Sequence, residues 1–197
     1  YNQYHQRIYL QRCAWVDNYP PNEAMRVYHD TEWGKPEYDD DKLFELLSLE
    51  TYQTGLSWQT VIDKRERFNE RFEGYVIDKV AQYDESYVED LLRDAGIIRN
   101  RAKLLATINN AKAMQRVQRE FGSFAKWLWE FVDNTPIDHQ IVHSGDVPAQ
   151  DALSQQVSKA MKKLGFKFVG PVTVYSFLQG AGLINDHEVT CAFHDVY

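Results

Sequence analysis

Apolar residues recur along most of the chain at the three- and four-residue spacing of α-helices. Residues 40–50 are so densely apolar that we expect this helix to be buried on all sides. Ser57 can cap the helix that follows. Residues 85–94 predict a shorter helix that ends at Gly96, a suitable residue for a left-handed cap.

The second half of the chain continues this helical pattern. A long helix is predicted to begin near Arg99, and Ser123 can cap the next one. Residues 152–164 are amphipathic, and Gly165 is expected to end their helix. Pro171 is well placed in the first turn of a last helix that ends near Gly182. Since no stretch alternates convincingly as a strand would, the pattern predicts an all-α fold.

Length and composition predict one compact domain. The chain has 197 residues, of which 44% are apolar, and it contains no repeat or linker. We expect a domain over residues 11–197 and an N-terminal extension, residues 1–10, whose order the sequence leaves open. The apolar stretches are too short to cross a bilayer and no signal sequence opens the chain. Two cysteines suit a reducing compartment, so the expected location is the cytoplasm, with no membrane contact.

The charge is unevenly distributed. A net charge of −7 argues against a protein that coats nucleic acid through bulk positive charge. However, residues 95–119 carry +6 and residues 152–185 carry +4, with no acidic side chain in either segment. One face could therefore bind an anion, and the alternative is that these basic residues lie on ordinary solvated helix faces.

Residues 94–101 predict two helices joined by a very short turn. Free backbone N–H groups at the start of the second helix form an anion site, and Arg99 and Arg101 add positive charge. Such a turn can hold a DNA phosphate. The alternative is an ordinary antiparallel helix pair capped by Gly96.

Two cysteines and two histidines form a candidate zinc set. Cys13 and His29 are 16 residues apart, whereas His187 and Cys191 are four apart and would share one face of a helix. A complete Cys2His2 set would be structural, and it would join the two ends of the chain. The alternative is two unrelated buried thiols and two surface histidines, and His194 is a competing ligand.

The first third of the chain concentrates aromatic residues in the same stretch as Glu50, namely Trp15, Tyr28, Trp33, Tyr52 and Trp58. A carboxylate at the end of a very apolar helix is costly to bury. Glu50 therefore either takes part in a cap at the helix end or is kept to bind a ligand. Aromatic faces beside a carboxylate suit a flat, cationic ring. The alternative for the aromatics is an ordinary core.

Several segments resemble, in unbroken order over residues 12–191, the bacterial DNA-3-methyladenine glycosylase I family. They are RCAW (12–15), YHDTEWG (28–34), LE (49–50), GLSW (55–58), DAGIIR (94–99), GFKFVG (165–170) and NDH (185–187). The resemblance implies a helix-hairpin-helix DNA repair glycosylase. Its partner would be double-stranded alkylated DNA, and free 3-methyladenine would be its product. We expect a monomer by default.

The resemblance also implies roles for the residues around the candidate base pocket. Glu50 corresponds to the family's carboxylate that hydrogen-bonds the flipped base. Tyr28 and Trp58 correspond to the aromatics that hold this base, and Trp15 and Trp33 to further pocket walls. Glu50 would recognise the base edge and favour a positively charged ring, with electrostatic help to catalysis, rather than act as a strong general base.

Further contacts follow from the same resemblance. The expected structural zinc ligands are Cys13, His29, His187 and Cys191. Gly55 and Leu56 correspond to the loop whose apolar tip fills the gap that the extruded nucleotide leaves. The expected phosphate-binding hairpin includes Gly96, Ile98, Arg99 and Arg101.

The chain departs from the family pattern at a few positions. Met25 stands where the family often has a tyrosine, and Tyr52 and Thr54 replace small or amide residues near Glu50. The turn at residues 99–101 has no lysine that could form a Schiff base with the sugar, which predicts a monofunctional enzyme that leaves an abasic site.

Two other functions fit parts of the pattern. A non-catalytic DNA-binding module would use the hairpin to hold phosphate, but it gives no reason for Glu50 among aromatics. A zinc hydrolase would use His187 and Cys191 as ligands and Glu50 as a base, but it needs an open metal position. Both rank below the glycosylase.

Overall fold

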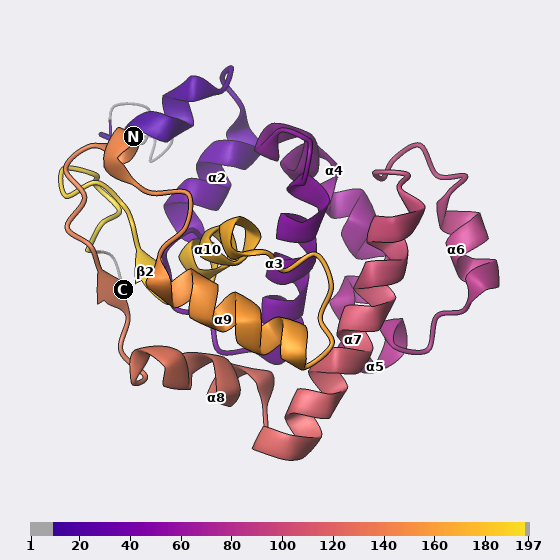
Figure 1. Cartoon of the computed structure of the whole chain (residues 1–197). Coiled ribbons are helices and arrows are strands. Elements are labelled where there is room, and N and C mark those ends of the chain that lie inside the picture. Colours follow the sequence, from indigo (N-terminus) through magenta and orange to yellow (C-terminus); the bar gives the residue numbers. More distant parts are fainter. Residues whose placement is uncertain (1–9, 196–197) are drawn as a thin grey trace.

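The computed structural model describes residues 10–195 and shows a mostly helical protein (Figure 1). Its α-helices are α2 (Glu23–Thr31), α3 (Asp40–Gln53), α4 (Trp58–Arg71), α5 (Ile77–Val80), α6 (Glu85–Leu91), α7 (Arg101–Phe121), α8 (Phe124–Trp129), α9 (Ala152–Lys163) and α10 (Pro171–Gly180). The 3-10 helices are η1 (Ala14–Asn18), η2 (Glu73–Tyr75), η3 (Glu130–Val132) and η4 (Ser144–Asp146). Two short strands are β1 (Ile137–Asp138) and β2 (Ile184–Asn185).

Helix α3 lies at the centre of the molecule (Figure 1). It contacts α4, α5, α7, α8 and α10, and every residue from 43 to 52 is buried. The Asp39 side chain accepts a hydrogen bond from the backbone N–H of Lys42 and so caps its first turn. The expectation of a fully buried helix is confirmed, although the helix continues to Gln53. Glu50 therefore lies within the core, close to the helix end.

The predicted helix caps are mostly confirmed. Ser57 and Ser123 each accept a hydrogen bond from a backbone N–H in the first turn of the helix that follows. Gly165 follows the end of α9 with a φ of +92°, and Pro171 is the first residue of α10.

The hairpin between α6 and α7 differs from the prediction. Helix α6 ends at Leu91 rather than near residue 94, and α7 begins at Arg101 rather than at Arg99, so residues 92–100 join the two helices in place of the very short turn that was expected. Gly96 is not in the left-handed conformation. Its N–H instead donates to Asp94 Oδ1 at 2.8 Å, because an aspartate side chain can form a turn with the backbone two residues later.

The strands correct the expectation of a chain without β-structure. β1 and β2 pair in parallel, with Ile137 opposite Ile184 and Asp138 opposite Asn185. Strands of two residues are too short to give a recognisable alternation. Their pairing connects the segment after η3 with the segment after α10.

The first and last described segments lie side by side (Figure 1). The N–H of Ala192 donates to the carbonyl of Gln11, and the cysteine near each end lies in the same cluster. The expectation for residues 1–10 concerns mainly residues 1–9, which are outside the described part. Within residues 10–195, no helix is both long and apolar enough to cross a membrane.

The chain after α10 packs closely against the backbone of residues 35–36, and substitution of Gly182 tests this packing. A Cβ at this residue would collide with the backbone of Lys35 and Pro36, whereas one at Gly74 would meet nothing within 4 Å. Both glycines have a positive φ, +77° and +71°. We expect Gly182→Ala to lower the free energy of unfolding by roughly 3 kcal/mol or more, and Gly74→Ala by only about 1 kcal/mol. Chemical denaturation measures both, and equal losses would contradict the close packing at Gly182.

Candidate functional site

A cavity of about 310 Å³ opens beside the C-terminal half of α3. It brings together all five residues that were expected to form a base pocket, together with six that were not expected. Its lining residues are Trp15, Tyr19, Tyr28, Trp33, Glu50, Gln53, Trp58, Ser144, Val147, Ser176 and Gln179.

The aromatic walls of this cavity come from separate elements. Tyr28 belongs to α2 and Trp58 opens α4, and their ring centroids are 5.3 Å apart. Trp15 of η1 meets Trp33, which follows α2, edge to face at 5.1 Å. The indole N–H of Trp15 is buried and has no hydrogen-bond partner among the described residues. It is a donor that a ligand in the cavity could satisfy.

Glu50 is the acidic residue of the cavity. Its side chain is 7% exposed and makes no hydrogen bond or ion pair with any described residue. Burial raises the pKa of its carboxyl group to about 8. A buried carboxylate without a partner is costly, so the geometry favours the alternative in which Glu50 is kept for a ligand.

Helix α10 closes the cavity near Glu50. A Cβ on Gly180 would lie 3.0 Å from the Tyr28 hydroxyl oxygen and 3.9 Å from Glu50 Oε1. The preceding residue, Gln179, lines the cavity and donates its side-chain N–H to Asp186 Oδ2 at 2.8 Å. Ser176 and Gln179 lie three residues apart and so share one helix face, but nothing in the sequence showed that this face borders a cavity.

Two departures from the family pattern lie away from this cavity. Tyr52 is fully buried, and its hydroxyl group hydrogen-bonds the side chains of Tyr75 and Thr107. Met25 is 1% exposed and borders a different, smaller cavity. Thr54, the third departure, lies with Leu56 at an adjoining cavity that Glu50 also lines.

The residues expected to contact DNA are exposed or half-buried, and one of the two arginines is paired with an acidic residue. Leu56 is 41% exposed in the turn between α3 and α4. Ile98 is half-buried in the hairpin, and Arg99 makes no ion pair with any described residue. Arg101, however, pairs with Glu89 at 2.5 Å, so its charge is partly neutralised.

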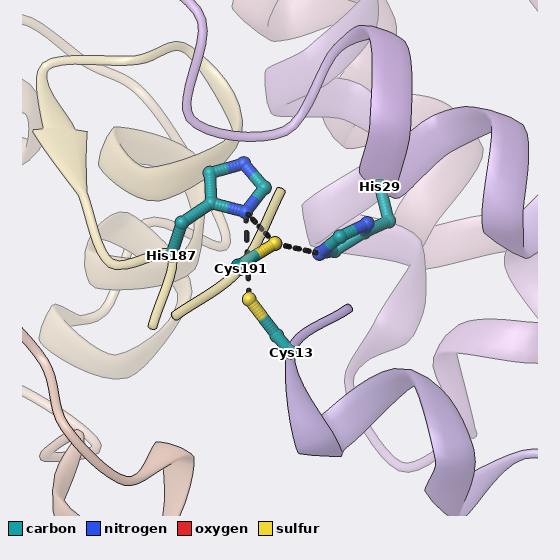
Figure 2. Close-up of side chains that lie close together, drawn as sticks. All are labelled: Cys13, His29, His187 and Cys191. Atoms are coloured by element: carbon teal, nitrogen blue, oxygen red, sulfur yellow. Dashed lines mark hydrogen bonds between the residues drawn. The ribbon is translucent and has the colours of Figure 1, made fainter. Parts of the chain in front are cut away.

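The four expected zinc ligands form one buried cluster (Figure 2). Their ligating atoms all lie within 4.8 Å of one another. Cys191 Sγ lies 3.7 Å from His29 Nε2 and 3.6 Å from His187 Nδ1, and Cys13 Sγ lies 3.4 Å from His187 Nδ1. A tetrahedral zinc with bonds of about 2.0–2.3 Å separates its ligand atoms by roughly 3.5 Å, so the donor set fits this ion.

Hydrogen bonds from outside the cluster orient its imidazole rings. His29 Nδ1 lies 2.7 Å from Asp30 Oδ1, and His187 Nε2 lies 2.7 Å from the carbonyl oxygen of Trp33. Each histidine therefore turns its other nitrogen toward the cysteines, as metal-binding histidines generally do. His194 lies outside the group and pairs with Asp138, so it is not a competing ligand in this arrangement.

Comparison with known proteins identifies relatives along nearly the whole chain. The methyladenine glycosylase family model matches residues 15–195. DNA-3-methyladenine glycosylase 1 of Escherichia coli (strain K12) is 45% identical over 182 residues, which cover 92% of this chain and 96% of the relative.

Solved structures agree with this match. 3-Methyladenine DNA glycosylase I from Staphylococcus aureus has a TM-score of 0.87 at 39% identity, and the match covers 90% of this chain and 95% of that one. A variant of 3-methyladenine DNA glycosylase I in complex with 3-methyladenine has a TM-score of 0.89 at 38% identity, covering 93% and 97%. The chain belongs to the methyladenine glycosylase family.

Proposed function

We propose that this protein is a monofunctional DNA-3-methyladenine glycosylase. It extrudes 3-methyladenine from alkylated duplex DNA, hydrolyses the N-glycosidic bond and leaves an abasic site. One observation carries the proposal: an unpaired carboxylate, Glu50, is buried among aromatic rings in a cavity large enough for one flat base.

The charge of the damaged base fits this cavity. Methylation at the 3 position makes adenine in DNA cationic, which both weakens the glycosidic bond and distinguishes the lesion from neutral adenine. A cation beside Glu50 favours its ionised form, and the ionised carboxylate in turn binds the cation strongly in a site of low dielectric constant. Tyr28 and Trp58 supply ring faces for stacking, and the indole N–H of Trp15 supplies a donor for a ring nitrogen.

The exposed segments support a base-flipping mechanism. The hairpin at residues 94–101 holds a phosphate with the N–H groups at the start of α7 and with Arg99. Leu56 enters the base stack and fills the gap as the nucleotide rotates into the cavity. The glycosidic bond then breaks through an oxocarbenium-like sugar, and water completes the hydrolysis.

Glu50 acts by recognition and electrostatic stabilisation. It is the only acidic side chain among the described residues that line the cavity, and it is needed to hold the base. A monofunctional reaction is supported by the cavity lining, since none of the described cavity-lining residues is a lysine, and by Lys103, whose ammonium group donates to two backbone carbonyls. We therefore expect hydrolysis without strand cleavage.

We also infer that the cysteine-histidine cluster binds a structural Zn²⁺. The closed Cys2His2 set leaves no position for a substrate, which opposes the zinc-hydrolase alternative. The cluster also supports the base cavity, since the His29 ring lies 5.4 Å from Trp15 and the His187 ring 4.7 Å from Trp33. Zinc would join η1 and α2 to the segment after α10, and it would thereby fix these two cavity walls.

The partners follow from the same site. The cavity and the metal cluster are each complete within one chain, which supports a monomer that binds duplex DNA and releases free 3-methyladenine. Neither cysteine forms a disulfide, which is consistent with the reducing conditions of the cytoplasm.

Glu50→Gln tests the proposed activity directly. We expect wild-type protein to release free 3-methyladenine from methylated duplex DNA, without nicking the strand unless base or heat is added. The variant should release it at least about 100-fold more slowly, because it lacks the charge that binds the cation. Glu66→Gln, on the exposed face of α4, is the matched control. Failure of folded wild-type protein to release the base would favour a non-catalytic DNA-binding module.

The raised pKa of Glu50 predicts a pH-dependent stability difference. Because the carboxyl group has a pKa of about 8 in the folded protein and about 4.5 when unfolded, the folded state binds one more proton between these values. The wild type should therefore lose stability relative to Glu50→Gln as the pH rises from 5.5 to 8.5, by up to roughly 3 kcal/mol. Denaturation of both proteins at the two pH values measures this, and a constant difference would mean that Glu50 is ionised in the empty cavity.

Metal analysis tests the zinc assignment. We expect one zinc per chain, lost in Cys13→Ser and Cys191→Ser, with several kcal/mol of stability lost when the ion is removed from the wild type. His194→Ala should retain the zinc, because His194 lies outside the cluster. Loss of zinc in that control, or a wild type without zinc, would contradict the assignment.

A further inference from the structure

The turn that carries Leu56 has a defined backbone conformation. Thr54 has φ −51° and ψ 115°, Gly55 has φ +79°, and the N–H of Leu56 donates to the carbonyl of Gln53 at 2.7 Å. These values describe a type II turn with glycine at its third position. A type I turn differs mainly by a flip of the central peptide, here the one between Thr54 and Gly55, and it would direct Leu56 differently.

The turn itself is exposed and has few contacts that could select one conformation. Residues 54–57 are all exposed, and a Cβ on Gly55 would meet nothing within 4 Å. A second element must therefore hold the central peptide if Leu56 is to enter DNA in one direction. Lys103 provides this contact: its ammonium group donates to the carbonyl oxygens of Tyr52 and Thr54, both at 2.7 Å.

Burying the charged side chain of Lys103 at this position is energetically unfavourable. The residue is only 5% exposed, and burial lowers its pKa. An apolar side chain of similar length would fill the space without the cost of burying a charge. The ammonium group, unlike an apolar side chain, selects one orientation of the central peptide, because its hydrogen bond to the Thr54 carbonyl forms only in the observed orientation. Its bond to Tyr52 also places a positive charge at the C-terminal end of α3, where it is favourable.

Lys103 also connects two segments that would contact DNA. It lies in the first turn of α7, where its backbone N–H donates to the side chain of the capping residue Asn100 at 3.1 Å. Asn100 belongs to the hairpin, between Arg99 and Arg101. The hairpin and the Leu56 turn are thus joined through one side chain.

We propose that Lys103 is a positioning residue that fixes the direction of Leu56 relative to the phosphate-binding hairpin. This role rests on the proposed glycosylase function. Lys103 does not touch the base, since it is absent from the lining of the cavity. It acts on the step in which the duplex is opened and the nucleotide is captured.

The first test separates base binding from base extrusion in Lys103→Met. Binding of free 3-methyladenine, followed by the fluorescence of the cavity tryptophans, should change by less than about twofold, because the cavity is intact. Single-turnover excision from methylated duplex DNA should fall at least about tenfold. A lesion placed opposite an abasic site, which is easier to extrude, should recover part of this loss. Lys126→Met, at an exposed lysine of α8, controls for loss of one positive charge.

A double-mutant cycle tests whether Lys103 acts through Leu56. In a Leu56→Ala background, Lys103→Met should lower excision by less than about twofold, because no wedge remains to be directed. Gly55→Ala disfavours the same turn without touching Lys103, since its backbone is strained but its Cβ would meet no neighbour. This variant should also retain base binding and lose excision, and it keeps the proposal testable if Lys103→Met folds poorly.

Several outcomes would overturn the proposal while wild-type protein still releases 3-methyladenine. They are equal losses of base binding and excision in Lys103→Met, full additivity with Leu56→Ala, and unchanged excision in either Lys103→Met or Gly55→Ala. A wild type that releases no base would instead contradict the proposed function itself.

Discussion

The burial of α3 is the constraint on which the rest of the structure depends, because this helix carries two carboxylates into the core. Glu45 is satisfied: although burial opposes it, hydrogen bonds and charge from Arg65, together with Asn69 and Lys42, lower the pKa of Glu45 to about 2. Glu50, five residues later, has no such partner, and burial raises its pKa to about 8. The fold can therefore neutralise a buried carboxylate of α3 with side chains from α4, and the described residues supply no such partner to Glu50, which favours a role for Glu50 toward a ligand.

The two ends of the described chain hold the aromatic walls of the cavity in position. η1 and the segment after α10 contain little regular structure, so their positions depend on contacts with each other. The cysteine-histidine cluster lies at this junction, with its histidine rings packed on Trp15 and Trp33. A closed metal site here would give rigidity to a region that a small hydrophobic core cannot order by itself. The cysteine-histidine cluster and the cavity therefore share two aromatic contacts, at Trp15 and Trp33.

Local chemistry explains what could be predicted from the sequence and what could not. The caps at Ser57 and Ser123 depend on neighbouring residues, so sequence reasoning placed them correctly. The predicted cap at Gly96 was wrong because α6 already ends at Leu91, and the Gly96 N–H forms a turn with the Asp94 side chain instead. The resemblance to a family identified Glu50, the aromatic residues of the cavity and the four residues of the cysteine-histidine cluster. Gln179 and Ser144 could not be identified from the sequence, because only tertiary packing brings them to the cavity. Nothing in the sequence showed that Lys103, one of six basic residues between 95 and 119, is buried, because its burial depends on contacts with the end of α3.

Burial of Glu50 also provides a physical basis for choosing a damaged base over a normal one. In the empty cavity the carboxyl group is mostly protonated near pH 7, because its pKa is about 8. A neutral adenine offers no charge to ionise it and must compete with its own stacking and pairing in DNA. In the proposed function a cationic 3-methyladenine would ionise it, and the low dielectric constant that raises the pKa would then strengthen the resulting ion pair. In the proposed function, the free-energy cost of burying Glu50 and the selectivity for a charged base therefore have the same physical origin, which is the low dielectric constant around the carboxyl group.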